Sequence, residues 1–206
     1  PVYLNGMTVK EASAHVQREF SKIFSGITSS EAVSQIRLTL GQIRSIQVNI
    51  MGEVAAPGTY RLSSFATVFH ALYRAGGVNT IGSLRNIMLM GNNKCIAKID
   101  VYDFILKGDL SGDVSLMEGD LIVVPPYETL VSISGKVKRE MDYEMKQGET
   151  LSTLIEYSGG FVGDAYTDAV RIVRKTGPEL KIHIINSIDF STFKLEDGDA
   201  ISIGST

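Results

Sequence analysis

The chain has 206 residues, with 20 Lys and Arg against 23 Asp and Glu, and a formal net charge of −3. Hydrophobic residues make up 44% and charged residues 21% of the chain. This composition is ordinary for a folded protein and excludes a largely disordered or collagen-like one. The small negative charge gives no electrostatic basis for nucleic-acid binding, so we expect no nucleic-acid partner.

No apolar run in the sequence exceeds four residues. A membrane-spanning helix needs about 20 apolar residues, so no transmembrane segment is expected in this chain. The chain starts at Pro1, without an initiator Met or a signal peptide, and we therefore expect a processed or excised fragment. The single cysteine, Cys95, cannot form an internal disulfide, and because free cysteines are usually buried we expect it in the core.

The first 44 residues contain a helix signal and a weaker strand signal. Thr8 followed by Glu11 matches a capping box, which predicts that a helix starts there. A loose alternation over residues 33–40 predicts a strand, and residues 1–4 resemble the end of another. This segment therefore has the pattern of a partial α+β domain. The apolar residues that recur every four positions along the helix are Ala12, Val16, Phe20 and Phe24.

The rest of the chain repeats itself. Residues 48–54 resemble residues 131–137, which follow 83 positions later, and near the end of each copy the offset becomes 79. Matched glycines at a fixed offset indicate a duplicated structural unit. The marks that the copies share are Gly52 and Gly135, Tyr60 and Tyr143, Gly76-Gly77 and Gly159-Gly160, and Gly119-Asp120 and Gly198-Asp199.

Each copy predicts the same order of elements. A strand with period-two alternation ends at a glycine, and in copy one Pro57-Gly58 supplies the following turn. A short strand and a helix come next, and the helix ends at the Gly-Gly pair. Two strands, a loop with a possible helical turn and a closing strand complete a β-grasp-like unit of the α+β class. The later strands are expected at residues 87–90, 95–99 and 121–124, and again at 170–173, 180–184 and 200–203.

The motifs of copy one resemble the SLBB domain, a soluble ligand-binding β-grasp. They are Val48-x-Ile-x-Gly-Glu-Val-x-x-Pro-Gly-x-Tyr60, Ala71-Leu72-x-x-Ala75-Gly-Gly77 and Leu116-x-x-Gly-Asp-x-Ile-x-Val-Pro125. Copy two lacks the Pro-Gly turn, which residues 138–141 replace, and this leaves the shape of its first hairpin open.

Two such domains after a Gly6-Met-Thr-x-x-Glu-Ala12 helix resemble the outer-membrane polysaccharide export proteins of the Wza-like family. The resemblance implies part of a polysaccharide-export domain over residues 1–44 and SLBB domains over 45–126 and 129–204. Pro125-Pro126 is expected to link the two SLBB domains.

The same resemblance implies a function without catalysis or cofactors. Such a protein would lie in the periplasm of a Gram-negative bacterium, associated with the outer membrane. It would form a ring-shaped homo-oligomer that conducts capsule or exopolysaccharide and acts with an inner-membrane polysaccharide co-polymerase. The alternative is a monomeric module that binds a soluble sugar or another small ligand in a discrete pocket.

The sequence offers no constellation for catalysis or metal binding. The histidines have no metal-ligand spacing, so neither a metal site nor a catalytic site is expected. Carboxylates cluster at Glu118–Asp120 and Glu196–Asp199, where Asp and Gly predict turns and supply too few oxygens for a calcium loop. The histidines are His15, His70 and His183.

The candidates for sugar binding are two arginines and the aromatic faces of Tyr60, Tyr73, Tyr127, Tyr143, Tyr157 and Tyr166. Tyr60 and Tyr143 have aromatic faces, but their shared repeat position favours a structural role for both. Arg37 and Arg44 flank a predicted strand and are candidates to face an acidic polymer, with a solvated surface position as the favoured alternative. The chain has no Trp, which removes the most recognisable stacking platform.

Overall fold

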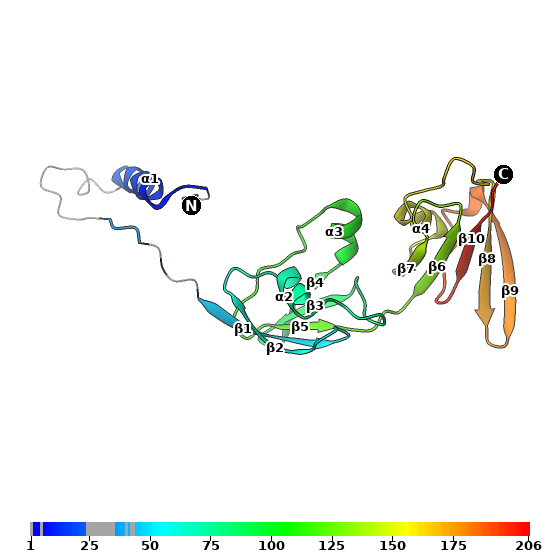
Figure 1. Cartoon of the computed structure of the whole chain (residues 1–206), viewed down its shortest axis with the longest axis horizontal. Helices are drawn as coiled ribbons and strands as arrows, with labels where there is room; N and C mark the ends of the chain where they lie inside the picture. The colour runs from blue at the N-terminus through cyan, green and yellow to red at the C-terminus, as the bar shows by residue number, and fades with distance from the viewer. Residues whose placement is uncertain (1, 5, 24–35, 40, 42–43) are drawn as a thin grey trace, which may run out of the picture. The chain divides into compact units, whose positions relative to one another are not determined.

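The computed structural model describes residues 2–4, 6–23, 36–39, 41 and 44–206 (Figure 1). The chain divides into two units, Pro1–Arg44 and Ser45–Thr206. The second unit contains both copies of the repeat. None of the helices in the described part of the chain is long and apolar enough to cross a membrane.

The predicted helix of the first unit is confirmed as α1 (Val9–Ser21), and Thr8 is its N-cap. The Thr8 hydroxyl accepts a hydrogen bond from the Glu11 N–H, and the Glu11 carboxylate accepts one from the Thr8 N–H at 2.9 Å. This reciprocal pair satisfies two N–H groups that the helix itself leaves unpaired. Ala12, the first of the recurring apolar residues, is buried, whereas Phe24 lies outside the described residues.

The strands expected in the first unit are absent where the structure describes them. Residues 2–4 and 36–39 have no strand geometry. The remaining positions of the expected strands, residues 1, 33–35 and 40, lie outside the described residues. The alternation over residues 33–40 was too irregular for a reliable period-two signal.

The first repeat is a five-stranded mixed sheet with a helix on one face. The strand order is β2-β1-β5-β3-β4, in which β1 and β5 are parallel neighbours and the other pairs are antiparallel. Buried side chains of the helix and the sheet form one hydrophobic core. Its elements are β1 (Ser45–Gly52), β2 (Gly58–Ser63), α2 (Val68–Arg74), β3 (Ile87–Gly91), β4 (Lys94–Ile99), α3 (Val101–Lys107) and β5 (Leu121–Val124).

The second repeat has the same topology, with strand order β7-β6-β10-β8-β9. The tandem β-grasp-like α+β fold is therefore confirmed. The β6–β7 hairpin forms without the Pro-Gly turn, although β7 has four residues where β2 has six. The elements are β6 (Leu130–Gly135), β7 (Met141–Glu144), α4 (Leu151–Tyr157), β8 (Ala169–Thr176), β9 (Glu179–Asn186), the 3₁₀ turn η2 (Ser187–Asp189) and β10 (Ala200–Ile203).

Gly52 and Gly135 end the first strand of each repeat, and both have a backbone that favours glycine. Their φ values are +90° and +92°. A Cβ at Gly52 would collide with the carbonyl oxygen of Val124, and one at Gly135 with that of Ile203. The first and last strands of each repeat therefore approach so closely that a side chain has no room at these positions.

Helix α3 is the largest difference between the repeats. The sequence predicted only a possible helical turn here, but the Asp100 carboxylate caps two full turns by accepting the Tyr102 N–H at 3.0 Å. The second repeat has only η2 at this place. Tyr102 of α3 is buried in the core of the second repeat, and Leu84 and Leu106 pack against the same core. The first repeat thus completes the core of the second.

The Pro125-Pro126 linker is held against the first repeat. The Pro125 carbonyl accepts a hydrogen bond from the Ser83 N–H at 2.7 Å, and the Tyr127 N–H donates to the Ile81 carbonyl at 3.0 Å. The segment between the two sheets is therefore hydrogen-bonded to the first repeat at Pro125 and at Tyr127.

The expectation that Cys95 is a core residue is wrong, because its side chain is exposed. Ile99 and Ala97 of β4 alternate toward the core, and an unbroken alternation would have placed Cys95 with them. A register shift between Leu89 and Met90 pairs Cys95 with Met90 instead. This bulge reverses the face on which Cys95 lies.

Substitution of Gly52 by Ala tests the close approach of β1 and β5. Gly77 is a matched control because its φ is +86° but a Cβ at this position would meet no atom within 4 Å. We expect Gly77→Ala to lower the free energy of unfolding by about 1 kcal/mol from backbone strain alone. Gly52→Ala should cost about 3 kcal/mol or more, since β5 must also move. Urea unfolding measures both values, and equal losses would contradict the steric explanation.

Candidate functional site at the junction of the two repeats

Tyr60 and Tyr143 each close the first hairpin of their own repeat. The Tyr60 hydroxyl donates to the carbonyl of Ala56, and the Tyr143 hydroxyl donates to the carbonyl of Arg139 at 3.3 Å. Both bonds span four residues, so the two tyrosines have equivalent positions in the repeats. The structure does not bring them together into one site, and sugar binding at either stays a prediction.

Arg37 and Arg44 lie in the first unit, and both side chains are exposed. A contact between these arginines and an acidic polymer also stays a prediction.

The carboxylate clusters form turns, as predicted. The Asp120 carboxylate accepts the Met117 N–H at 2.8 Å, and the Asp199 carboxylate accepts the Glu196 N–H at 2.9 Å. Each turn also holds the start of its repeat's first strand, through Glu118 in one copy and Asp197 in the other. Within the described residues, no group of three His, Cys, Asp or Glu side chains could hold a metal ion.

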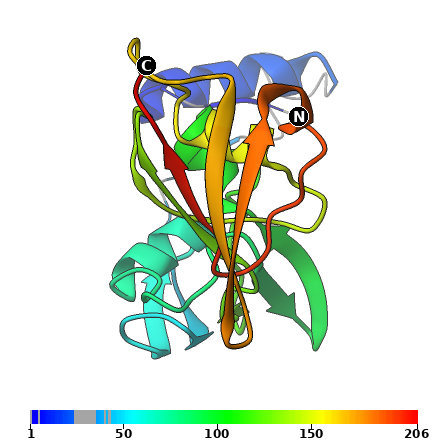
Figure 2. The same cartoon turned by 90° about the vertical axis from the view of Figure 1, so that its right-hand side faces the viewer.

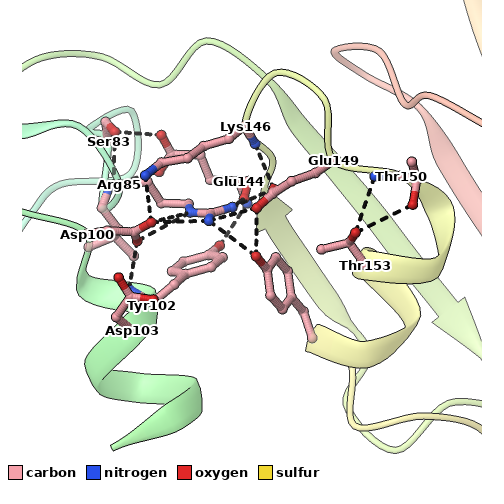
Figure 3. A network of polar contacts seen from close by, with 12 residues as sticks. Ser83, Arg85, Asp100, Tyr102, Asp103, Glu144, Lys146, Glu149, Thr150 and Thr153 are labelled. Atoms are coloured by element: carbon pink, nitrogen blue, oxygen red, sulfur yellow. Dashed lines mark hydrogen bonds and ion pairs between the residues drawn. The ribbon is translucent and has the colours of Figure 1, made fainter. Parts of the chain in front are cut away.

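The most extensive polar network joins the two repeats around Arg85 (Figure 3). Arg85 precedes β3 in the first repeat, and its side chain is only 5% exposed. The guanidinium donates to Asp100, with Nη2 at 3.1 Å, and to Glu149, with Nη1 at 2.7 Å and Nη2 at 2.9 Å. Nη1 also donates to the carbonyl of Glu144 at 3.0 Å. Since Asp100 belongs to the first repeat and Glu149 to the second, Arg85 ties the repeats together.

Two tyrosine rings enclose the same guanidinium. The Arg85 Cζ lies 4.6 Å from the ring centre of Tyr102 in α3 and 5.3 Å from that of Tyr157 in α4. The rings themselves meet edge to face, with centres 5.6 Å apart. The Tyr157 hydroxyl donates to Glu149 at 2.7 Å. The cation therefore has carboxylates in its plane and aromatic faces beside it, an arrangement that compensates its loss of water.

Glu144 of β7 makes a second set of bonds across the junction. Its carboxylate accepts from the Ser83 hydroxyl and from the Leu84 N–H, the latter at 2.8 Å. Its own N–H donates to the Tyr102 hydroxyl at 2.7 Å. The Lys146 ammonium lies 2.7 Å from the Asp100 carboxylate. We call the residues of this network the clamp: Ser83, Arg85, Asp100, Tyr102, Glu144, Lys146, Glu149 and Tyr157.

Sequence reasoning missed the clamp, because a search for matched positions passes over residues that differ between the copies. At the offset of 83 residues, Asp168 occupies the place of Arg85. Likewise, Glu144 and Tyr157 stand where copy one has Arg61 and Arg74. The sequence does carry a signal for the junction. At these positions the two copies align, but the charge of the side chain is reversed or lost from one copy to the other.

The clamp shifts the pKa values of its acidic groups. Burial acts to raise the pKa of Asp100, but hydrogen bonds from Arg85 and Lys146 outweigh it and hold the pKa below its ordinary value. Burial likewise opposes ionisation of Glu149, and the bonds from Arg85 and the Lys146 N–H again lower its pKa. Burial and the bond to Glu149 raise the pKa of Tyr157 to about 12. At neutral pH both carboxylates are ionised and Tyr157 remains a donor.

A cleft of about 540 Å³ lies beside the clamp and is lined by both repeats and the linker. Its walls carry side chains of both charges, two amides and the apolar surface of Met88 and Pro125. Such a surface can hydrogen-bond a hydrophilic ligand. The polar side chains are Asn86, Lys98, Glu128, Glu144, Lys146 and Gln147.

Replacement of Arg85 by Met tests the clamp. The substitution leaves Asp100 and Glu149 half-buried without their shared cation, so we expect a loss of about 3 kcal/mol in the free energy of unfolding. The two repeats should then also unfold in separate transitions in calorimetry. Lys107→Ala is the matched control: it breaks the exposed Lys107–Asp103 pair and should leave the free energy of unfolding nearly unchanged, because water screens an exposed pair. A single transition in Arg85→Met with unchanged stability would contradict the role given to Arg85.

The contribution of the clamp should depend on pH. The folded-state pKa values of Asp100 and Glu149 lie below their ordinary values of 3.8 and 4.5. Their stabilisation is therefore complete above the ordinary values and is lost as the pH falls below 4.5 and through the folded-state pKa values. We expect the stability difference between the wild type and Arg85→Met to be largest near neutral pH and to shrink steadily on acidification, because burial without the cation favours protonation of the two carboxylates in the variant. Urea titrations at each pH measure it, and a difference that grows on acidification would refute this linkage.

Comparison with known proteins agrees with the duplicated architecture. The family model of the SLBB domain matches residues 46–124 and 129–203, one match for each repeat. Two curated relatives, both named polysialic acid transport protein KpsD of Escherichia coli, are 27% identical over 148 residues, which cover 71% of this chain and 25% of each relative. The chain thus spans about a quarter of the length of the curated relatives that it matches. Because the two SLBB matches cover most of its residues, the chain belongs to the SLBB domain family.

Proposed function

We propose that this chain is part of a polysaccharide export protein and contributes two stacked SLBB domains to an oligomeric conduit. The similarity to polysialic acid transport proteins supports polysaccharide as the cargo. The observation that carries the proposal is the clamp, which binds the two domains into one body with a shared core. A conduit works through fixed geometry and a hydrated lining and needs no catalytic residues.

In this proposal the domain pair acts as a rigid spacer in each subunit. Identical subunits would meet through heterologous contacts that close into a ring. If the two domains turned freely against each other, the rings formed by the first and second domains would lose their common axis. The clamp prevents this rotation because Arg85 bonds to both repeats at once. The partners would be the polysaccharide, further copies of the chain and an inner-membrane polysaccharide co-polymerase, in the periplasm and at the outer membrane.

A second candidate function is a monomeric module that binds a soluble sugar. The cleft of about 540 Å³ beside the clamp supports it, since the side chains of Asn86, Lys98 and Gln147 line this cleft and make no hydrogen bond to other described residues. This candidate requires saturable binding without self-association, whereas the conduit requires a closed oligomer.

The mass of the protein extracted from outer membranes in mild detergent tests the proposal, with light scattering as the readout. We expect a single large oligomer for the wild type and a smaller or mixed population for Arg85→Met. Lys107→Ala, the surface control, should assemble like the wild type. A strictly monomeric wild-type protein that binds a soluble sugar would refute the conduit and favour the binding module.

A further inference from the structure

The β8–β9 hairpin of the second repeat, gold and orange in Figure 2, has a free edge and an extended tip. Strand β9 is the last strand of its sheet, with β8 as its neighbour. The two strands pair from Ala169 opposite Asn186 to Thr176 opposite Glu179. Strand β10 pairs with β8 only along residues 171–173. The part of the hairpin nearer its turn therefore projects beyond the rest of the sheet.

One face of β9 carries a row of large aliphatic side chains. Leu180, Ile182 and Ile184 alternate along the strand and so point to the same side of the sheet. They are 68%, 59% and 62% exposed. Exposed aliphatic residues at three successive positions on one face of an edge strand mark an interaction surface, because soluble proteins usually protect such edges with charges or bulges.

Basic side chains stand beside this row on the same face. The register places Lys175 opposite Leu180 and Arg171 opposite Ile184, and opposed residues point to the same side. Both are exposed, and neither forms an ion pair with another residue that the structure describes. By contrast, Arg174 is paired with Asp199 and Glu196.

The hairpin is strongly basic within an acidic chain. Its basic residues outnumber its single acidic residue, Glu179, while the whole chain has a net charge of −3. The equivalent β3–β4 hairpin of the first repeat lacks the aliphatic row, since its edge strand exposes only Ile96 among large hydrophobic side chains. The fold itself therefore does not require this surface. The basic residues of the β8–β9 hairpin are Arg171, Arg174, Lys175 and Lys181.

We propose that this face of the β8–β9 hairpin binds the surface of a phospholipid bilayer that contains anionic headgroups. Leu180, Ile182 and Ile184 would enter the boundary between headgroups and acyl chains, and Arg171 and Lys175 would contact lipid phosphates. An aliphatic surface flanked by basic residues has the chemistry of peripheral membrane segments, which do not cross the bilayer. The inference does not depend on an oligomeric conduit.

Charge favours a lipid surface over a second copy of the chain. Two copies that stacked face to face on this surface would gather Arg171 and Lys175 of both copies in one interface, and like charges in an interface oppose association. A polyanionic polysaccharide could pair with the two basic residues, but it would leave the aliphatic row unused. Of these three occupants, the bilayer is the one that uses both the aliphatic row and the basic side chains beside it.

Co-sedimentation of the full chain with vesicles tests the proposal. We expect binding to vesicles of phosphatidylethanolamine and phosphatidylglycerol, and weak binding to phosphatidylcholine alone. Ile182→Thr with Ile184→Thr should abolish binding while preserving β-branched side chains in the strand. Lys175→Glu should weaken binding by about fivefold or more, since each basic residue near an anionic bilayer contributes about that factor. Lys94→Glu, at the corresponding hairpin of the first repeat, is the matched control and should bind like the wild type.

Two outcomes would overturn the inference. In the first, the chain fails to bind anionic vesicles, or the Ile182 and Ile184 double variant binds as the wild type does. In the second, analytical ultracentrifugation shows a dimer that the double variant abolishes, which would assign the face to a second copy. Circular dichroism and urea unfolding of each variant separate these outcomes from a loss of fold.

Discussion

The junction of the two repeats depends on a cation that has almost no access to water. Removing a guanidinium from water costs several kcal/mol unless carboxylates and aromatic faces replace the lost hydration. For Arg85 these replacements come from both repeats: Asp100 and Tyr102 from the first, Glu149 and Tyr157 from the second. The compensation is therefore complete only when the repeats adopt one mutual orientation.

The same sheet occurs twice, but the copies are not interchangeable. Positions that build the sheet agree between them, such as the strand-ending Gly52 and Gly135. Positions that face the junction differ, as Arg85 and its counterpart Asp168 do. The positions that the copies share therefore build the sheet of each repeat, and the positions that differ form the contact between the repeats.

Local signals made most of the fold predictable from the sequence. The strand alternation, the Thr8–Glu11 capping box and the Gly-Gly helix ends each act over a few residues, so a single sequence reveals them. The site was not predictable in this way, because Arg85 meets Glu149 across 64 positions of the chain. The prediction for Cys95 failed for a third reason: a one-residue bulge reverses a strand's faces without a distinct signature in composition.

Helix α3 makes the pairing of the two repeats asymmetric. The first repeat donates Tyr102 to the core of its neighbour, and the second repeat receives it. The second repeat itself has no such donor, since η2 is a single 3₁₀ turn and Asp168 has the opposite charge to Arg85. A third copy stacked on the second repeat would receive neither a tyrosine ring in its core, as Tyr102 provides, nor an arginine shared between domains, as Arg85 is. The pairing device is thus one-directional: the second repeat receives the tyrosine ring and offers no equivalent of its own.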